Sequence, residues 1–153
     1  MTPTTKQRAW RTAATLTGAT TALMSLGVAL PAQAHAALRC ETLRATVTNS
    51  QGLAGGTVRA TVCKADNGDA HFHEGYYNYV QDHQPDGTAA RAYVRERYGT
   101  YGPIGVDDTS TSGGQSISWM SNGAGNTTIR VYVCLGTKNP NQSGARCASD
   151  YMS

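Results

Sequence analysis

The sequence predicts an all-β fold, a single antiparallel β-sandwich of two sheets with about seven or eight strands and two disulfide bonds. Three observations support this prediction. Signals that begin or end helices are scarce after residue 34, whereas turn residues recur roughly every eight to twelve positions, which is typical of sandwiches and barrels. Several segments alternate apolar and polar residues, as a strand with one buried face does. The four cysteines are an even number and lie in the same part of the chain.

The 153-residue chain is predicted to begin with an export signal at residues 1–34. A basic start precedes an apolar run at 22–30, and residues 32–34 have the small-x-small pattern of a cleavage site. Residues 35–153 are predicted to form one secreted, extracellular domain of about 119 residues without a membrane span, because no later apolar run is long enough. All ten acidic residues but only ten of the thirteen basic ones follow residue 34, so this domain has no net charge. A nucleic-acid binder that relies on bulk positive charge is therefore not expected.

The first two predicted strands form a hairpin. Apolar residues occupy every second position of 43–48 and again of 58–63, and the glycine-rich segment 49–56 connects the two as a loop. If these strands pair antiparallel, Cys40 comes close to Cys63, within the spacing that a disulfide requires.

Cys40, Cys63, Cys134 and Cys147 allow three disulfide pairings, of which we favour Cys40–Cys63 and Cys134–Cys147. The first pair joins neighbouring strands of the hairpin, and the second closes the loop around Pro140. Each bridge is expected to stabilise the fold by roughly 3 kcal/mol. A redox or catalytic thiol is not expected, because the sequence has no C-x-x-C motif and no cysteine is left over.

Further strands are predicted at 76–80, 103–107, 115–120 and 127–135. The last has the clearest pattern, with Ile129, Val131 and Val133 expected inward and Arg130 and Tyr132 outward.

Segment 88–98 is ambiguous, because its apolar residues fit a helical face and, almost as well, one face of a strand. The short turn at 86–87 and the surrounding β pattern favour a strand.

Several features follow one another in a recognisable order. They are an early cysteine at Cys40, the Asp-Gly turn at 86–87, an isolated Trp119, the segment 130–134 and the closing segment 146–149. This order, with ten arginines to three lysines, resembles the small secreted β-sandwich proteins of Streptomyces and other actinobacteria, most of which have no assigned activity. Some similar exported proteins are adaptor subunits of umbrella-shaped toxin particles. The resemblance therefore implies an adaptor between secreted subunits.

The histidines suggest a metal site only as an alternative. On a strand, His71 and His73 share one face roughly 7 Å apart, which suits Zn²⁺ or Cu²⁺. His83 is the third ligand available, but a straight chain places it about 33 Å from His73. The simpler interpretation of 71–74 is a polar loop between strands, so we predict neither a metal nor another cofactor.

No catalytic constellation is visible. The sequence lacks a G-x-S-x-G elbow, a phosphate loop and an H-E-x-x-H motif. Asp82, Asp86, Asp107 and Asp108 are interpreted as turn residues rather than as a Ca²⁺ site or an acid–base pair. We therefore expect a protein that is not an enzyme.

Tyrosine and arginine usage points to binding. All eight tyrosines follow residue 34, and both residue types are over-represented at binding hot spots. If 88–98 is a strand, Arg91, Tyr93, Arg95 and Arg97 share one face. The predicted binding surface consists of Tyr77, Tyr79, Arg91, Tyr93, Arg95, Arg97 and Trp119. The alternative is an amphipathic sheet with half-buried tyrosines.

The sequence therefore predicts a secreted protein-binding module, an adaptor or structural subunit of an exported toxin-type assembly, whose partner is another secreted protein or a cell-surface ligand. One alternative is an inhibitor of an extracellular hydrolase that inserts the loop 138–144 into a cleft. The other is a metal-binding protein that uses His71 and His73.

Overall fold

The computed structural model describes residues 38–110, 113–124 and 127–153. The described residues form ten strands and no helix. The strands are β1 (Leu38–Thr48), β2 (Ala54–Ala65), β3 (Ala70–Phe72), β4 (Tyr79–Asp82), β5 (Ala90–Glu96), β6 (Gly99–Asp107), β7 (Gln115–Ser116), β8 (Met120–Ser121), β9 (Ile129–Leu135) and β10 (Arg146–Met152). The predicted export signal lies outside the described residues.

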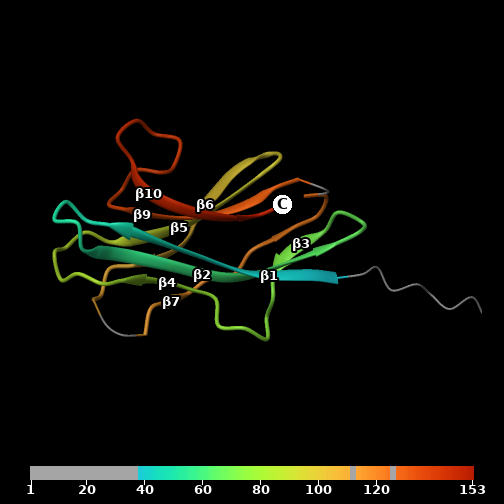
Figure 1. Cartoon of the computed structure of the whole chain (residues 1–153), viewed down its shortest axis with the longest axis horizontal. Helices are drawn as coiled ribbons and strands as arrows, with labels where there is room; N and C mark the ends of the chain where they lie inside the picture. Colours follow the sequence, from blue (N-terminus) through green and yellow to red (C-terminus); the bar gives the residue numbers. More distant parts are fainter. Residues whose placement is uncertain (1–37, 111–112, 125–126) are drawn as a thin grey trace, which may run out of the picture. The chain divides into compact units, whose positions relative to one another are not determined.

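The strands form two antiparallel sheets, as predicted (Figure 1). In the six-stranded sheet the long strand β2 pairs with β1 along one edge and with both β3 and β4 along the other. Strands β8 and β7 extend this sheet beyond β3 and β4. The four-stranded sheet has the order β10-β9-β5-β6.

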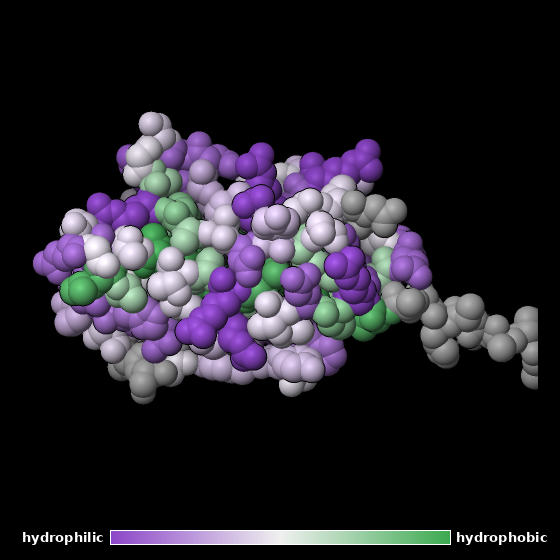
Figure 2. All heavy atoms as spheres, in the orientation of Figure 1, coloured by the Kyte–Doolittle hydropathy of each residue, from purple (hydrophilic) through white to green (hydrophobic). Residues whose placement is uncertain are grey.

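The core lies between the two sheets and consists mainly of small β-branched residues and alanines. Alternation placed these residues correctly, because Leu43, Val58 and Val133 point inward and are at most 1 % exposed. In the view of Figure 2, hydrophobic residues reach the surface only in scattered spots among polar ones. None of the described residues belongs to a helix that is long and apolar enough to cross a bilayer.

Both predicted disulfides are present. Cys40 lies directly opposite Cys63 in the β1–β2 hairpin, with the Cα atoms 4.0 Å apart. Cys134 and Cys147 face each other in the β9–β10 hairpin, with the Cα atoms 4.1 Å apart. Disulfides of this kind are typical of an oxidising, extracellular-type environment.

Segment 88–98 contains a strand rather than a helix, since β5 pairs with β6 on one side and β9 on the other. Three other expectations need correction. Residues 70–72 form the short strand β3 instead of a polar loop, the predicted strand 76–80 begins only at Tyr79, and 115–120 forms two short strands. Strand β10 was not predicted, because its only buried apolar side chain is Met152.

Candidate functional site

The outer side of the four-stranded sheet carries several arginines. Alternation along β5, β9 and β10 directs the following side chains outward: Arg91, Tyr93, Arg95, Arg130, Tyr132, Cys134, Cys147, Ser149 and Tyr151. None of these outward positions of the three described strands holds a carboxylate. We call this surface the arginine face.

Two arginines of this face stand directly opposite each other. Arg95 of β5 is the register partner of Arg130 of β9. The Arg130 guanidinium lies 4.8 Å from the ring centroid of Tyr151 and donates to Ser149 Oγ at 3.1 Å. Like charges opposite each other destabilise an antiparallel pair, so this arrangement is not explained by stability.

A hollow of about 430 Å³ opens at this point. Its lining residues come from the end of β5 and the start of β9: Arg95, Glu96, Arg97, Thr127, Thr128, Arg130 and Tyr132. Three arginines and one carboxylate, Glu96, therefore border one depression, and the excess of positive charge favours carboxylates and other anions.

Glu96 lies beneath this end of the sheet. It is 5 % exposed, and neither of its carboxylate oxygens has a hydrogen-bond partner of good geometry within the described part of the chain. Tyr101 is a group that interacts with this carboxylate. The pKa of Tyr101 is raised, chiefly by this hydrogen-bonding interaction with Glu96, and also by burial and by the nearby Glu96 and Tyr98 charges.

Of the seven residues predicted as one binding surface, only Arg91, Tyr93 and Arg95 lie on the arginine face, with Arg97 beside them at the hollow. Arg91 Nε donates to Gly136 O at 2.7 Å, so its side chain supports the neighbouring loop. Tyr93 is only 3 % exposed, and burial raises its pKa against the lowering effect of Arg91. Tyr93 therefore belongs to the packed sheet rather than to a contact surface.

The other three residues lie on the six-stranded sheet. Tyr77 and Tyr79 stack with ring centroids 5.1 Å apart, and Tyr77 donates to Gly113 O. Trp119 packs against Phe72, with centroids 5.7 Å apart. The seven residues therefore do not form one surface.

Sequence reasoning did not include Arg130, Tyr132 and Tyr151 in the binding surface. The alternation of 127–135 had already directed the first two outward. What the sequence could not supply was the pairing of β9 with β5, which places Arg130 beside Arg95.

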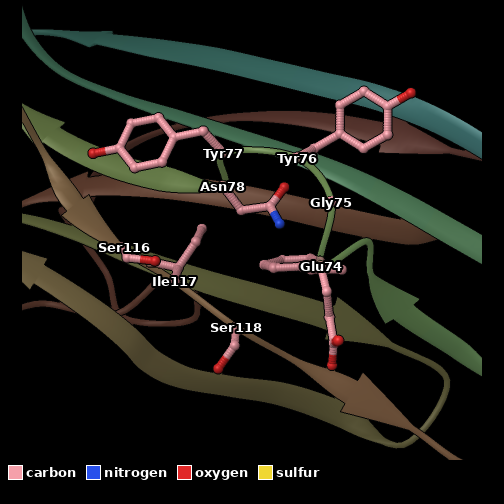
Figure 3. Close-up of a pocket in the computed structure, with 9 residues that line it drawn as sticks. Glu74, Gly75, Tyr76, Tyr77, Asn78, Ser116, Ile117 and Ser118 are labelled. Atoms are coloured by element: carbon pink, nitrogen blue, oxygen red, sulfur yellow. The ribbon is translucent and has the colours of Figure 1, made fainter.

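A second hollow, of about 490 Å³, lies between the segment 73–78 and the segment 116–118 (Figure 3). We call residues 73–78 the tyrosine loop. Asn78 anchors this loop to β2: its Oδ1 accepts from Thr61 N at 2.8 Å and its Nδ2 donates to His73 O at 3.0 Å. The Asn78 amide thus replaces main-chain pairing where the sheet is interrupted between β3 and β4.

Two of the described histidines are held by structural contacts, and the third, His71, lies in β3 between Cys63 of β2 and Met120 of β8. His73 Nδ1 accepts from Gly75 N at 3.0 Å, and His83 Nε2 lies 2.8 Å from Thr57 Oγ1 at the β4 end of the sheet. Within the described residues, no group of three or more His, Cys, Asp or Glu side chains is placed to hold a metal ion.

Asp82 and Asp107 come together although they are far apart in the sequence. Asp107 Oδ2 accepts from Asp82 N at 2.9 Å, and Asp82 Oδ1 accepts from Gln84 N at 3.0 Å. Both carboxylates are buried, and both stabilise turns. This agrees with the turn role predicted for them.

The loop 138–144 is exposed and internally hydrogen-bonded. Asn139 N donates to Gln142 Oε1 at 2.7 Å, and Lys138 Nζ donates to Ser143 O at 2.9 Å. The Cys134–Cys147 disulfide closes its base.

No protein-family model, curated protein or solved structure matches this chain. The site chemistry therefore rests on the geometry described above.

Proposed function

We propose that the protein is a secreted, non-enzymatic module that binds the acidic surface of another protein through the arginine face. The observation that carries this proposal is the direct opposition of Arg95 and Arg130 beside a hollow that Arg97 also borders. The predicted export signal and the two disulfides support secretion.

Electrostatics suggests the partner's chemistry. Two opposed arginines cost the free sheet a few tenths of a kcal/mol, up to about 1 kcal/mol. A carboxylate between them removes this repulsion and gains charge-assisted hydrogen bonds. Arginines and tyrosines at the centre of an interface are also the residue types that contribute most to binding energy. An acidic protein surface therefore complements this face.

Two roles are compatible with such a module: an adaptor or structural subunit of an exported assembly, and a ligand of a cell surface. Both use the same face, and the identity of the partner separates them. A gene for a large toxin or a lectin-like protein next to this one would favour the adaptor role.

The test is capture of a partner from the culture supernatant of the producing organism, followed by affinity measurement with the purified partner. The chain offers a matched control, since Arg44 and Arg59 are a second directly opposed pair, on the six-stranded sheet. We expect R95Q/R130Q to weaken binding at least tenfold and R44Q/R59Q to leave it within twofold. Recovery of the free monomer alone, or equal losses in both double variants, would contradict the proposal.

A second candidate is inhibition of an extracellular hydrolase through the loop 138–144. Its internal hydrogen bonds and the disulfide at its base favour this role, because a rigid loop loses little entropy when it enters a cleft. The test is a panel of secreted proteases and glycosidases. Absence of inhibition across the panel removes this candidate.

A further inference from the structure

We propose that the hollow beside the tyrosine loop binds a neutral oligosaccharide. The hollow belongs to the six-stranded sheet and shares no lining residue with the hollow of the arginine face. The proposal is therefore independent of the protein-binding function.

The loop that borders the hollow is held in one conformation. His73 fixes its start, because Nδ1 accepts from Gly75 N and the ring meets Tyr76 edge-on with centroids 4.9 Å apart. Asn78, only 6 % exposed, fixes its end through the amide contacts with β2 and through its carbonyl, which accepts from Ile117 N at 3.0 Å. A preformed site avoids the entropic cost of ordering a loop on binding.

The hollow combines an apolar floor with polar groups on its wall. Phe72 and Ile117 form the floor, and each is 4 % exposed. Glu74, Ser116 and Ser118 supply a carboxylate and two hydroxyls. In Figure 3 the side chains of Glu74 and Ser118 project to the same side, whereas the rings of Tyr76 and Tyr77 extend away in different directions.

A smaller hollow of about 160 Å³ adjoins the first and lengthens the site. The two share Phe72, Glu74 and Ser118, and the smaller one continues to Trp119 and Met120. The larger volume lies within the range of about 300–1,000 Å³ that is usual for small-molecule sites. Two adjoining hollows suit a ligand of more than one ring.

Exposed aromatic and apolar side chains surround the site. Tyr76 is 52 % exposed, Tyr77 53 % and Met120 74 %. Large apolar groups that gather on a surface around a hollow indicate an interaction site.

The lining chemistry selects the ligand class. Glu74 is the one carboxylate that lines either hollow, and no Lys or Arg does, so an anionic ligand is repelled. A wholly apolar ligand would remove Glu74 and the two serines from water without replacing their hydrogen bonds. A sugar satisfies both requirements, because its hydroxyls bond to the carboxylate and serines while its C–H faces cover the apolar floor and the ring of Trp119.

The experiment is a titration of the secreted protein with cellotetraose, maltotetraose and tetra-N-acetylchitotetraose, followed by two-dimensional ¹H–¹⁵N NMR. We expect at least one of them to bind with a Kd on the order of 1 mM or tighter. The shifted amides should lie in 72–78 and 116–120. Trp119→Ala and Glu74→Gln should each weaken binding at least tenfold.

Two controls make the test specific. Tyr98→Ala removes a tyrosine that is 66 % exposed and lines neither hollow, so it should leave the Kd unchanged. The variant His73→Asn keeps a side-chain acceptor for Gly75 N. It should therefore bind the oligosaccharide with a lower Kd than His73→Ala does. The proposal is overturned if none of the three sugars saturates the protein at about 20 mM. It is equally overturned if the affinity is unchanged in Trp119→Ala, or if the sugar shifts the amide signals of the arginine face instead.

Discussion

Asp82 carries a carboxylate whose ionisation the fold opposes. It is 2 % exposed, and its pKa is raised chiefly by burial and further by Asp86 and Asp107, against the lowering effect of the bond from Gln84 N. A group with a raised pKa in the folded state binds its proton more tightly there than in the unfolded chain. Its stabilising contribution is therefore full below about pH 4, the ordinary pKa of Asp, and is lost as pH rises through the folded-state pKa.

We expect Asp82→Asn to raise the free energy of unfolding at pH 7, because the amide oxygen still accepts from Gln84 N and no charge is buried. This advantage should shrink as the pH falls and vanish below about pH 4. Urea unfolding between pH 3 and pH 8 measures it, with Asp66→Asn, at an exposed carboxylate that does not act on Asp82, as the matched control. If the free energy of unfolding of Asp82→Asn differs from that of the wild type by an amount that does not change with pH, the raised pKa of Asp82 is contradicted.

Single residues of the candidate site were predictable in direction but not in burial. Alternation gave the outward direction of Arg91 and Arg95 and the inward direction of Val94. It did not predict that the Tyr93 side chain is buried. A Cβ atom on Gly102 would lie 2.8 Å from the Tyr93 ring, so β6 can pack over this tyrosine only because residue 102 is a glycine. Such a contact depends on strand pairing, which a single sequence does not reveal.

At the scale of the elements, the β1–β2 and β9–β10 hairpins are each crosslinked by one disulfide. The bridges span 23 and 13 positions of the chain. Because the entropy of loop closure grows only slowly with length, the two should stabilise the fold by similar amounts, about 3 kcal/mol each. We expect C40A/C63A and C134A/C147A each to lower the free energy of unfolding by about this much.

Denaturant unfolding of the two variants checks this expectation. The control is the wild type under reducing conditions, which should lose more stability than either variant. A loss confined to C40A/C63A would show that the β9–β10 hairpin holds without its bridge.

Elements with clean alternation were predictable, and interrupted ones were not. Strands β1 and β9 bury every second side chain along most of their buried part, and β2 has the same alternation of apolar residues although it buries most of its other side chains as well. The predicted strand 76–80 starts late, because the Asn78 side chain takes the place of main-chain pairing and residues 73–77 leave the sheet. Aromatic composition favoured a strand there, but side-chain hydrogen bonds decided the conformation.

At the scale of the whole molecule, the charge of residues 35–153 is balanced in sum and uneven in distribution. The ten basic and ten acidic residues after residue 34 cancel. The strand register shows how these charges are distributed in space. The outward positions of β5, β9 and β10 hold arginines, whereas Asp66, Asp69 and Asp86 lie in loops. Composition correctly gave the net charge, but a face with locally positive potential follows only from the fold.

This uneven distribution is measurable without any partner. R95Q/R130Q and R44Q/R59Q remove the same charge from two different sheets. If the arginine face is the main positive surface, wild-type protein that consists of residues 35–153 should bind a cation exchanger at low salt, although its basic and acidic residues cancel. R95Q/R130Q should then elute at lower salt than R44Q/R59Q, because the second variant keeps Arg91, Arg95 and Arg130 together. Thermal unfolding of both variants controls for loss of structure. Equal elution of two folded variants would mean that the arginine face has no dominant field, and would remove the electrostatic basis for an acidic partner.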